Sequence, residues 1–484
     1  MSGAGAAPGG PPPFGVGVPG NRWDLLSGAE PERWPTVTVV VVHFRQQREL
    51  DRTLAALRAQ TYPAELLDVV VVDDGSPEAP VVPHGVTLLR QHDDGFRAGA
   101  ARNLGVASSR GEILCFLDAD TSPEPDYVQR MARLPALAPE ALTVGHRRHA
   151  DFARLASVLP SPSPSPTSVA AGQDEVGRAA EVELAEPGWL VEAYRASGDL
   201  LEADQRSYRY VIGAVLCCTR WFFEQVGGFD ETFRDYGGED WEWAHRAWVA
   251  GAVLAHVPDA VAWHDGPDWD ARTAADPARL RRKNAETLAL AASVPVRGSR
   301  PHALLGGAAD VVVRLAGPAH AGWSDAAMFV AVDSILTALP QARVEVTGPL
   351  PSALTADPRV EVVTRVPAAA AAAGDGVRSA LSCVSSCGAP PRVVVEVARP
   401  IRVRAEGAAR LAWAVEAVGV GTLGAVEFTG ADGASVVAVR SNRAGERARR
   451  WGTDEFFETI REPAPWLAPL DAEPDVEAYL GGWS

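Results

Sequence analysis

The chain has 484 residues, of which 47% are hydrophobic and 22% charged, and its formal net charge is −17. This length exceeds what one hydrophobic core usually organises, so we expect two or more domains. The acidic balance argues against a general binder of nucleic acid or anionic membranes. A site for an anionic substrate would therefore need arginine or a metal ion to supply positive charge locally.

The cysteines and the start of the chain bear on the cellular compartment. Five cysteines are irregularly spaced and form no pattern typical of a zinc site or a disulfide framework. No apolar run reaches the ~18 residues that cross a bilayer, and the Gly/Pro-rich start lacks the features of a signal peptide. We expect a cytoplasmic protein, and peripheral contact with the inner face of the membrane stays open.

Composition divides the chain into segments. Residues 1–35 are rich in Gly and Pro and predict a disordered tail. Residues 36–298 are expected to form the first domain, and 159–187, with its Ser-Pro repeat, predicts a mobile insertion within it. Residues 299–484 are expected to form a second, smaller α/β domain.

Apolar, β-branched runs recur through the first domain. They begin near Val39, Val69, Val86 and Leu114. Such runs, with leucines at helical spacing between the first two, predict buried strands of a Rossmann-like α/β sheet covered on both faces. Polar residues follow where the strands end, and open α/β sheets bind ligands at those carboxyl ends.

The second domain repeats this spacing of strands. Its apolar runs begin near Val311, Arg343, Val360 and Val393. The intervals are 32, 17 and 33 residues, against 30, 17 and 28 in the first domain. We expect a degenerate copy of the same half-fold, although any two α/β domains can share strand spacing. Thr347–Leu350 and Ala398–Pro400 stand where the first domain has acidic strand ends, so the copy would have lost its site.

Carboxylates close two strands of the first domain. Asp73-Asp74-Gly-Ser follows the second strand, and Asp118-Ala-Asp120 follows the fourth. An Asp-x-Asp turn presents oxygen ligands of the kind that Mg²⁺ and Mn²⁺ prefer. The alternative is a pair of turn-forming aspartates.

A third acidic motif opens a helix. Gly237 and Gly238 allow a sharp turn, and Glu239 and Asp240 then begin the helix. The helix N-terminus favours negative charge, so a carboxylate there could stay ionised and serve as a general base. An ordinary helix with an acidic first turn is the alternative.

In this order the acidic motifs, together with Thr36–Val42 and Gly95–Asn103, resemble glycosyltransferase family 2. The later part, Val226–His264, is similar to the carboxy-terminal half shared by galactosyltransferases and polypeptide N-acetylgalactosaminyltransferases. The resemblance covers roughly residues 36–270 and rests on the combined order of short motifs. It implies a GT-A type transferase that uses a nucleotide-diphospho-sugar, a hexosyltransferase of glycan biosynthesis.

The resemblance also implies roles for particular residues. Asp120 and His264 would bind Mn²⁺ or Mg²⁺, and Asp118 would touch the metal or the ribose. Asp240 would be the catalytic base, and Glu239 would bind the acceptor or a sugar hydroxyl. The other expected contacts of the nucleotide-sugar are His43, Asp73, Asp74, Arg97, Arg102, Asn103, Asp118 and Trp241. The family usually has asparagine or tyrosine at the position of His43, which leaves the nucleobase open.

Several hypotheses about function remain open at this point. An inverting transferase would use Asp240 as base, whereas a retaining transferase like the N-acetylgalactosaminyl enzymes would not need it. A non-catalytic sugar- or nucleotide-binding module is the third hypothesis. A dehydrogenase is disfavoured because no Gly-x-Gly-x-x-Gly follows the first strand. The acceptor could be a glycan, a lipid-linked sugar or a small molecule, and a homodimer is open.

Overall fold

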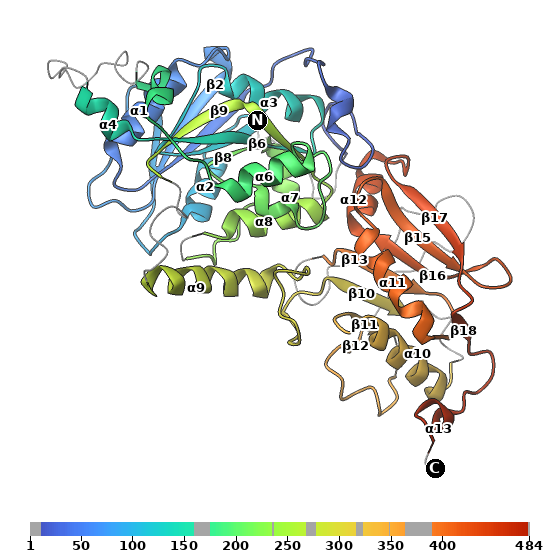
Figure 1. The fold of residues 1–484 in the computed structure, drawn as a ribbon. Helices are drawn as coiled ribbons and strands as arrows, with labels where there is room; N and C mark the ends of the chain where they lie inside the picture. Colours follow the sequence, from blue (N-terminus) through green and yellow to red (C-terminus); the bar gives the residue numbers. More distant parts are fainter. Residues whose placement is uncertain are drawn as a thin grey trace. The chain divides into compact units, whose positions relative to one another are not determined.

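The computed structural model describes residues 11–158, 175–234, 237–267, 277–315, 323–347, 349–363 and 390–482. The chain divides into two compact units, Met1–Trp248 with Ala252–Leu290, and Ala291–Ser484 with Val249–Gly251. Each unit is built on a sheet of its own (Figure 1). The division at residue 290 lies close to the domain boundary expected at 298.

The first unit contains a nine-stranded mixed sheet. The strand order is β3-β2-β1-β4-β8-β6-β9-β5, and β7 pairs with β6. The first four strands of this order are parallel, β8 is antiparallel to both β4 and β6, and β9 is parallel to β6. The strands are β1 (Val37–His43), β2 (Leu67–Asp73), β3 (Thr87–Arg90), β4 (Ile113–Asp118), β5 (Thr121–Pro123), β6 (Ala141–Ala150), β7 (Glu183–Leu184), β8 (Val215–Thr219) and β9 (Val253–Asp265).

Both faces of this sheet are covered, as expected from the valine-rich strands. Successive residues of a strand point to opposite faces, and Val39, Val40 and Val41 of β1 are all fully buried. The sheet is therefore the middle layer of an α/β unit, which confirms the predicted fold class. The helices are η1 (Trp23–Leu26), α1 (Gln47–Arg58), η2 (Ala64–Leu66), α2 (Ala98–Ala107), α3 (Tyr127–Leu137), α4 (Phe152–Val158), η3 (Ala179–Val182), α6 (Gly188–Ser197), η4 (Ser207–Tyr210), α7 (Arg220–Val226), α8 (Glu239–Val249) and α9 (Pro277–Ser293).

Glycines allow one close approach and one sharp turn that shape the site. A Cβ on Gly105 would lie 2.5 Å from Cγ1 of Val40, so its absence lets α2 lie directly on β1. Gly237 and Gly238 have φ values of 91° and 96°, a region that L side chains rarely adopt. These two residues turn the chain immediately before α8 and so direct the first turn of that helix.

The short edge strand β5 ties two predicted site segments together. Thr121 of β5 pairs with His264 of β9 in an antiparallel ladder. The backbone amide of Asp265 also donates a hydrogen bond of 2.9 Å to the carbonyl of Asp120. The turn that carries Asp120 is therefore fixed to the strand that carries His264.

The beginning of the chain differs from the expected tail from residue 11 onward. Val18 is buried in a cluster with Leu134 and Val253. The side-chain amide of Asn21 donates to the carbonyls of Leu200 and Leu254 at 2.7 and 2.9 Å. Gly and Pro content predicts poor intrinsic order, but these long-range contacts supply the burial that composition alone cannot reveal.

The expected insertion at 159–187 is also shorter than its composition indicates. Residues 159–174 lie outside the described residues. Val176, Ala179 and Val182, however, pack in a buried cluster with Phe152 and Trp263. A few apolar side chains at suitable spacing thus bring the acidic part of this segment back into the core, directly before α6.

Two further sequence expectations concern cysteines and membrane spans. Cys115, Cys217 and Cys218 are buried free thiols, and Cys383 and Cys387 lie outside the described residues. In the part of the chain that the structure describes, no helix has the length and apolar character needed to cross a membrane.

The second unit contains a seven-stranded sheet in the order β12-β11-β10-β13-β16-β15-β17 and a separate pair, β14-β18. Its strands are β10 (Val311–Leu315), β11 (Arg343–Val346), β12 (Val360–Val362), β13 (Val393–Val397), β14 (Ile401–Val403), β15 (Leu423–Thr429), β16 (Ser435–Ser441), β17 (Glu458–Pro463) and β18 (Leu467–Pro469). Its helices are α10 (Asp325–Ala338), α11 (Ala405–Ala417), α12 (Asn442–Trp451) and α13 (Val476–Tyr479).

The strand order of the second unit matches that of the first over seven strands. Strands β12-β11-β10-β13 are parallel, as are β3-β2-β1-β4. In the second unit the next strand, β16, is antiparallel to both neighbours and comes after its neighbour β15 in the chain. In the first unit β8 is likewise antiparallel to both neighbours and comes after its neighbour β6. The last strand, β17 or β9, is parallel to the one before it. The likeness therefore extends beyond the four strand runs whose spacing the sequence repeats.

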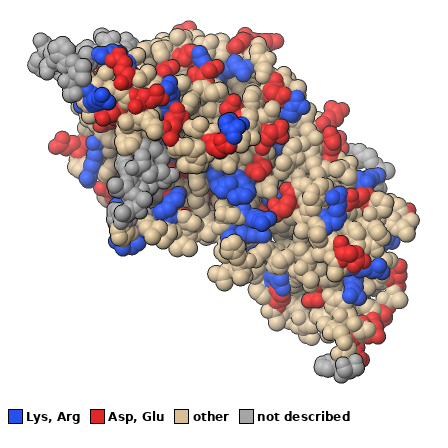
Figure 2. Space-filling view, viewed as in Figure 1, with Lys and Arg blue, Asp and Glu red and all other residues tan. Residues whose placement is uncertain are grey.

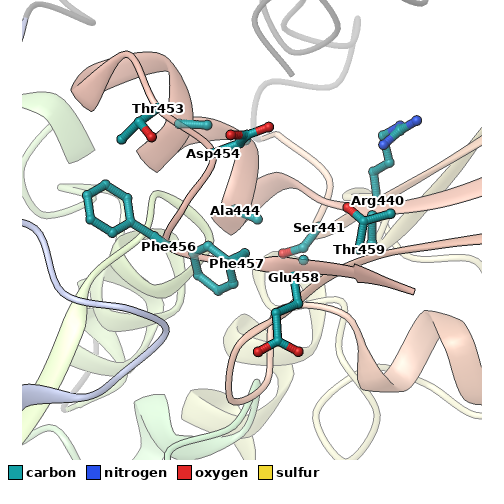
Figure 3. A pocket seen from close by; sticks show the side chains of 13 residues that line it. Arg440, Ser441, Ala444, Thr453, Asp454, Phe456, Phe457, Glu458 and Thr459 are labelled. Carbon is teal, nitrogen blue, oxygen red and sulfur yellow. The ribbon is translucent and has the colours of Figure 1, made fainter. Parts of the chain in front are cut away.

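A small cavity of about 60 Å³ lies in the second unit (Figure 3). Its walls include Ser441, Phe456 and Phe457. Ser441 pairs with Val393, the first residue of β13. The cavity is thus at the edge where the parallel strands begin, opposite their carboxyl ends.

At the carboxyl end of β13 an arginine stands where the first unit has its Asp-x-Asp turn. Ala398-Arg399-Pro400 follows β13, as Asp118-Ala-Asp120 closes β4. Arg399 forms an ion pair of 3.1 Å with Asp432. A guanidinium already paired with a carboxylate cannot serve as a metal ligand, so the second unit lacks this element of the site.

Candidate active site

A cavity of about 700 Å³ lies at the carboxyl ends of β1, β2 and β4 in the first unit. This volume falls within the ~300–1,000 Å³ typical of ligand pockets. Most of the residues predicted from the sequence meet here although they are far apart in the chain. Those that line the cavity are Asp74, Arg102, Asp118, Asp120, Glu239, Asp240, Trp241 and His264.

The turn after β4 brings Asp120 close to His264. Nε2 of His264 lies 3.6 Å from Oδ2 of Asp120, and the side-chain amide of Gln46 donates to the same oxygen at 2.9 Å. Nδ1 of His264 faces the carbonyl of Gly266 at 3.2 Å. A carbonyl only accepts, so Nδ1 carries a proton and Nε2 is the ring nitrogen that faces Asp120.

This arrangement has the chemistry of a partial cation site. When Nε2 carries no proton, this nitrogen and the carboxylate oxygen can bind one cation together. Among the described residues, however, no three His, Cys, Asp or Glu side chains stand together as a preformed metal site. Asp120 and His264 therefore fit a divalent ion whose remaining ligands come from elsewhere, as when Mg²⁺ is bound by carboxylates and substrate phosphates together.

Arg102 of α2 joins two parts of the site. Its guanidinium is buried and donates to Glu239 at 2.8 Å and to Asp118 at 3.0 Å. Burial alone would lower the pKa of Arg102, but the two carboxylates outweigh it and hold the pKa above its ordinary value. Burial raises the pKa of Asp118, although Arg102 opposes this. The arginine thus fixes the end of β4 relative to the first turn of α8.

Asp240 lies in the first turn of α8 and has a raised pKa. Its Oδ2 accepts a hydrogen bond of 2.9 Å from the amide of Gly213, and its Oδ1 accepts one of 2.8 Å from the amide of Trp241. Burial, and then the neighbouring charge of Glu239, raise the pKa of Asp240 to about 7. A carboxylate with this pKa can accept a proton and release it again near neutral pH, which suits a general base.

Glu239 and Trp241 flank this carboxylate. Glu239 binds Arg102 through Oε1, and Oε2 has no hydrogen-bond partner among the described residues. Trp241 is half-buried and lines the cavity, with Nζ of Lys283 lying 5.4 Å from its ring centroid. Trp243, by contrast, is fully buried against Phe223 and belongs to the core.

His43 and Asp73 were expected to contact the nucleotide but do not line the cavity. Both are buried, and Nδ1 of His43 lies 2.9 Å from Oδ1 of Asp73. Nε2 of His43 accepts from the amide of Gln46 at 3.1 Å, so Nδ1 is the donor to Asp73. Burial would raise the pKa of Asp73, but hydrogen bonds from Ser76, His43 and Arg90 lower it below the usual value. The pair holds the ends of β1 and β2 together, and its contact with a nucleotide stays a prediction.

Arg97 and Asn103 also lie outside the lining of the cavity. The backbone amide of Arg97 donates to Oδ2 of Asp74 at 2.9 Å, while its side chain lies 3.9 Å from Glu231. Asn103 exchanges two hydrogen bonds with the backbone of Phe229, at 2.9 and 3.0 Å. These residues position the cavity wall, and their direct contact with a nucleotide-sugar stays a prediction.

Several lining residues were missed from the sequence. Phe44 and Gln46 adjoin His43, and Phe96 lies within the motif Gly95–Asn103, so their proximity to those residues is the signal that could have found them. Trp189 of α6 and Lys283 of α9 lie in segments where the sequence shows no motif, so only the tertiary structure reveals that they line the cavity.

Cations and carboxylates both line the cavity of this acidic protein. On the face shown in Figure 2, basic side chains occur in small groups among acidic ones. The basic residues of the lining are Arg45, Arg102, Arg147 and Lys283, and the acidic ones are Asp74, Asp118, Asp120, Glu239, Asp240 and Glu286. Because carboxylates outnumber cations, a bound divalent ion would help the cavity to accept an anionic substrate.

A mixed α/β sheet with acidic strand ends around a ligand-sized cavity is the arrangement expected of a GT-A type transferase. Residues 38–167 match the model of the family described as glycosyl transferase family 2. Residues 202–262 match the model described as the N-terminal domain of galactosyltransferase. The resemblance predicted from the motifs is confirmed: residues 38–167 of the first unit are similar to glycosyl transferase family 2.

Curated relatives are named glycosyltransferases. A hyaluronan synthase of Pasteurella multocida is 29% identical over 259 residues, which cover 50% of this chain and 26% of the relative. A validoxylamine A glucosyltransferase of Streptomyces hygroscopicus subsp. limoneus is 29% identical over 236 residues, covering 46% of this chain and 49% of the relative. The chain thus spans only a quarter to half of these relatives.

Among solved structures, a mannosyltransferase of Pyrobaculum calidifontis in complex with GDP-Man and Mn²⁺ is similar at 19% identity with a TM-score of 0.34. The match covers 57% of this chain and 77% of that one.

Proposed function

We propose that this chain transfers a sugar from a nucleotide-diphospho-sugar to an acceptor hydroxyl and inverts the anomeric configuration, with Asp240 as base. The observation that carries the proposal is the shared cavity. It places the Asp120–His264 pair and a carboxylate whose pKa is about 7 around one ligand-sized space. The cytoplasmic location, the peripheral membrane contact and the homodimer stay predictions from the sequence.

The chain's own groups account for the proton and the leaving group. The acceptor hydroxyl gives its proton to Asp240 while its oxygen forms a bond to the anomeric carbon. The bond from that carbon to the diphosphate oxygen breaks, and the diphosphate leaves with the electron pair. Attack from the side opposite the leaving group inverts the centre. Arg102 and Glu239 hold Asp118 and α8 in the positions that this geometry requires.

A divalent cation, Mn²⁺ or Mg²⁺, would be held by Asp120 and His264, with Asp118 beside them, and would neutralise charge on the departing diphosphate. Asp74, at the end of β2, would then contact the nucleoside part of the donor. Burial raises the pKa of Asp74, and Gln91 and the amide of Arg97 hold it through hydrogen bonds.

The test of this proposal is whether metal and nucleotide depend on each other. Because the described residues offer no complete set of metal ligands, donor phosphates would supply the rest. We therefore expect Mn²⁺ to raise the affinity for UDP or GDP by at least about tenfold, and Asp120→Ala to abolish that gain. Calorimetric titration of both nucleotides with and without Mn²⁺ measures it. Asp432→Ala, which removes an exposed carboxylate of the second unit, is the control. Nucleotide binding that Mn²⁺ does not change would contradict the proposed metal site.

We also propose that the second unit is a duplicate of the first that carries no transferase chemistry. The shared order and directions of seven strands support duplication, and Arg399 in place of an acidic turn supports the loss of function. We therefore expect one nucleotide bound per chain in the same calorimetric titration. A stoichiometry of two, or loss of binding on Arg399→Ala, would show instead that the second unit keeps a site.

A further inference from the structure

The cavity continues along the sheet beyond the turn that carries Asp118 and Asp120, toward β6, which pairs with the strand of His264. Its lining begins after β2 with Asp74, passes Asp118 of β4 and Gly213 before β8, and reaches Arg147 of β6. In the order β2-β1-β4-β8-β6 these strands span four steps, or roughly 19 Å at about 4.8 Å a step. If the donor occupies the side from β2 to β4, the side formed by β8 and β6 is left for a second ligand.

An exposed tryptophan stands on that second side. Trp189 of α6 lines the cavity, yet 44% of its surface is exposed. Its ring centroid is 6.5 Å from that of Tyr210, just before the loop in which the Gly213 amide binds Asp240. A large aromatic face open to a cavity, beside the proposed base, is a surface that a flat ligand with an apolar face would cover.

A second hollow of about 260 Å³ adjoins this side. Arg147 lines both the large cavity and this second hollow. Of two consecutive residues of α6, Trp189 lines the large cavity and Leu190 lines the second hollow. The far wall combines the ring of Tyr194, stacked at 3.7 Å on that of His256, with two carboxylates that are each paired with a histidine. These pairs are Glu186 with His146, at 2.9 Å, and Asp199 with His256, at 2.8 Å.

The mixture of ring faces and carboxylates selects the chemistry of the ligand. A purely apolar ligand would cover Trp189 but would desolvate the carboxylate–histidine pairs without replacing their hydrogen bonds with water. A saccharide offers an apolar C–H face to an aromatic ring and hydroxyls to carboxylates around it. The second hollow lies just below the ~300–1,000 Å³ of pockets for larger ligands, which suits a single sugar ring.

We infer that the side formed by β8, β6 and α6 is the acceptor site, and that the acceptor is a saccharide of at least two units. One ring lies on Trp189 and presents its hydroxyl to Asp240, and the next ring enters the hollow beside Tyr194. This inference rests on the proposed transferase function, whose donor side supplies the sugar that is moved.

The experiment is saturation-transfer NMR of the full chain with a panel of monosaccharides and oligosaccharides, in the presence of diamagnetic Mg²⁺ and UDP or GDP. We expect oligosaccharides to bind the native chain, and Trp189→Ala to weaken them by about tenfold. Trp413→Ala, which removes a tryptophan of the second unit that is 40% exposed, is the matched control and should bind as the native chain does. Val191→Trp fills the second hollow from an exposed position and should weaken oligosaccharides more than monosaccharides.

The outcomes separate this inference from the function on which it rests. Nucleotide binding without binding of any saccharide would overturn the acceptor class and leave the transferase proposal standing. Oligosaccharide binding that Trp189→Ala does not change would overturn the placement, and no added effect of Val191→Trp on longer saccharides would overturn the second subsite. Absence of nucleotide binding would count against the proposed function itself.

Discussion

Replacement of Asp240 by asparagine is expected to lower kcat by about 10²–10⁴-fold, the usual contribution of a general base. Asparagine keeps the size of the side chain and can still accept a hydrogen bond from the Gly213 amide, but it cannot take the acceptor proton. Calorimetry should show nucleotide affinity close to that of the native chain. Transfer is measured as release of the nucleoside diphosphate in the presence of acceptor.

The pH dependence gives this expectation a second check. The pKa of Asp240 is raised to about 7, so the ionised form that acts as base is lost as the pH falls through 7. We expect kcat/KM of the native chain to fall about tenfold per pH unit below that value. Asp259→Asn, at an exposed position of β9, should keep the native profile. Full activity of the Asp240→Asn variant would favour the retaining mechanism. Nucleotide binding by a native chain that shows no transfer would favour a binding module.

Removal of Arg102 is expected to cost about 3–5 kcal/mol of the free energy of unfolding, as when one partner of a buried ion pair is lost. Arg102→Met would leave Asp118 and Glu239 facing each other in the cavity wall without the cation between them. Urea unfolding, followed for the transition of the first unit, measures the loss.

Two further variants separate charge from packing at Arg102. Adding Glu239→Gln to Arg102→Met removes one of the two uncompensated carboxylates and should recover part of the lost stability. Arg22→Met, which breaks an exposed pair with Asp24, should cost no more than about 1 kcal/mol. Equal losses for Arg22→Met and Arg102→Met would show that the central pair does not hold the site together.

The strands and the acidic cavity were predictable from the sequence because each depends on local pattern. A continuous valine run such as Val37–Val42 is compatible with little except a buried parallel strand. Carboxylates directly after such strands must lie at one edge of the sheet. Asp74, Asp118 and Asp120 accordingly meet Asp240 and His264 in one cavity.

The exceptions are residues whose role depends on tertiary neighbours. His43 closes β1 just as Asp118 closes β4, yet its side chain turns inward to Asp73, and no local signal distinguishes the two directions. Asn103 forms hydrogen bonds with the backbone of Phe229, which is 126 residues away in the sequence. Trp189 reaches the cavity only because Val176 and Val182 anchor the segment before α6.

The second unit shows the same limit of sequence patterns. Its four parallel strands were expected from spacing alone, whereas β15, β16 and β17 were not. β16 carries an apolar run, Val436–Val439, as long as those of β10 and β13, so an apolar run alone does not reveal a strand's place or direction in the sheet. Pairing also depends on partners that lie elsewhere in the chain. The match of all seven strands became visible only from their order in the sheet.

At the proposed metal site, the ladder of β5 and β9 would make metal affinity depend on how firmly the sheet edge stays closed. Asp120 precedes a strand of three residues, and its distance from His264 is kept by the Thr121–His264 pairing and the Asp265 amide. Fraying of so short an edge strand would separate Asp120 from His264. A metal ion bound by both residues would therefore oppose fraying. Bound metal should accordingly slow amide exchange at Asp265, so that a single backbone proton reports on occupancy of the site.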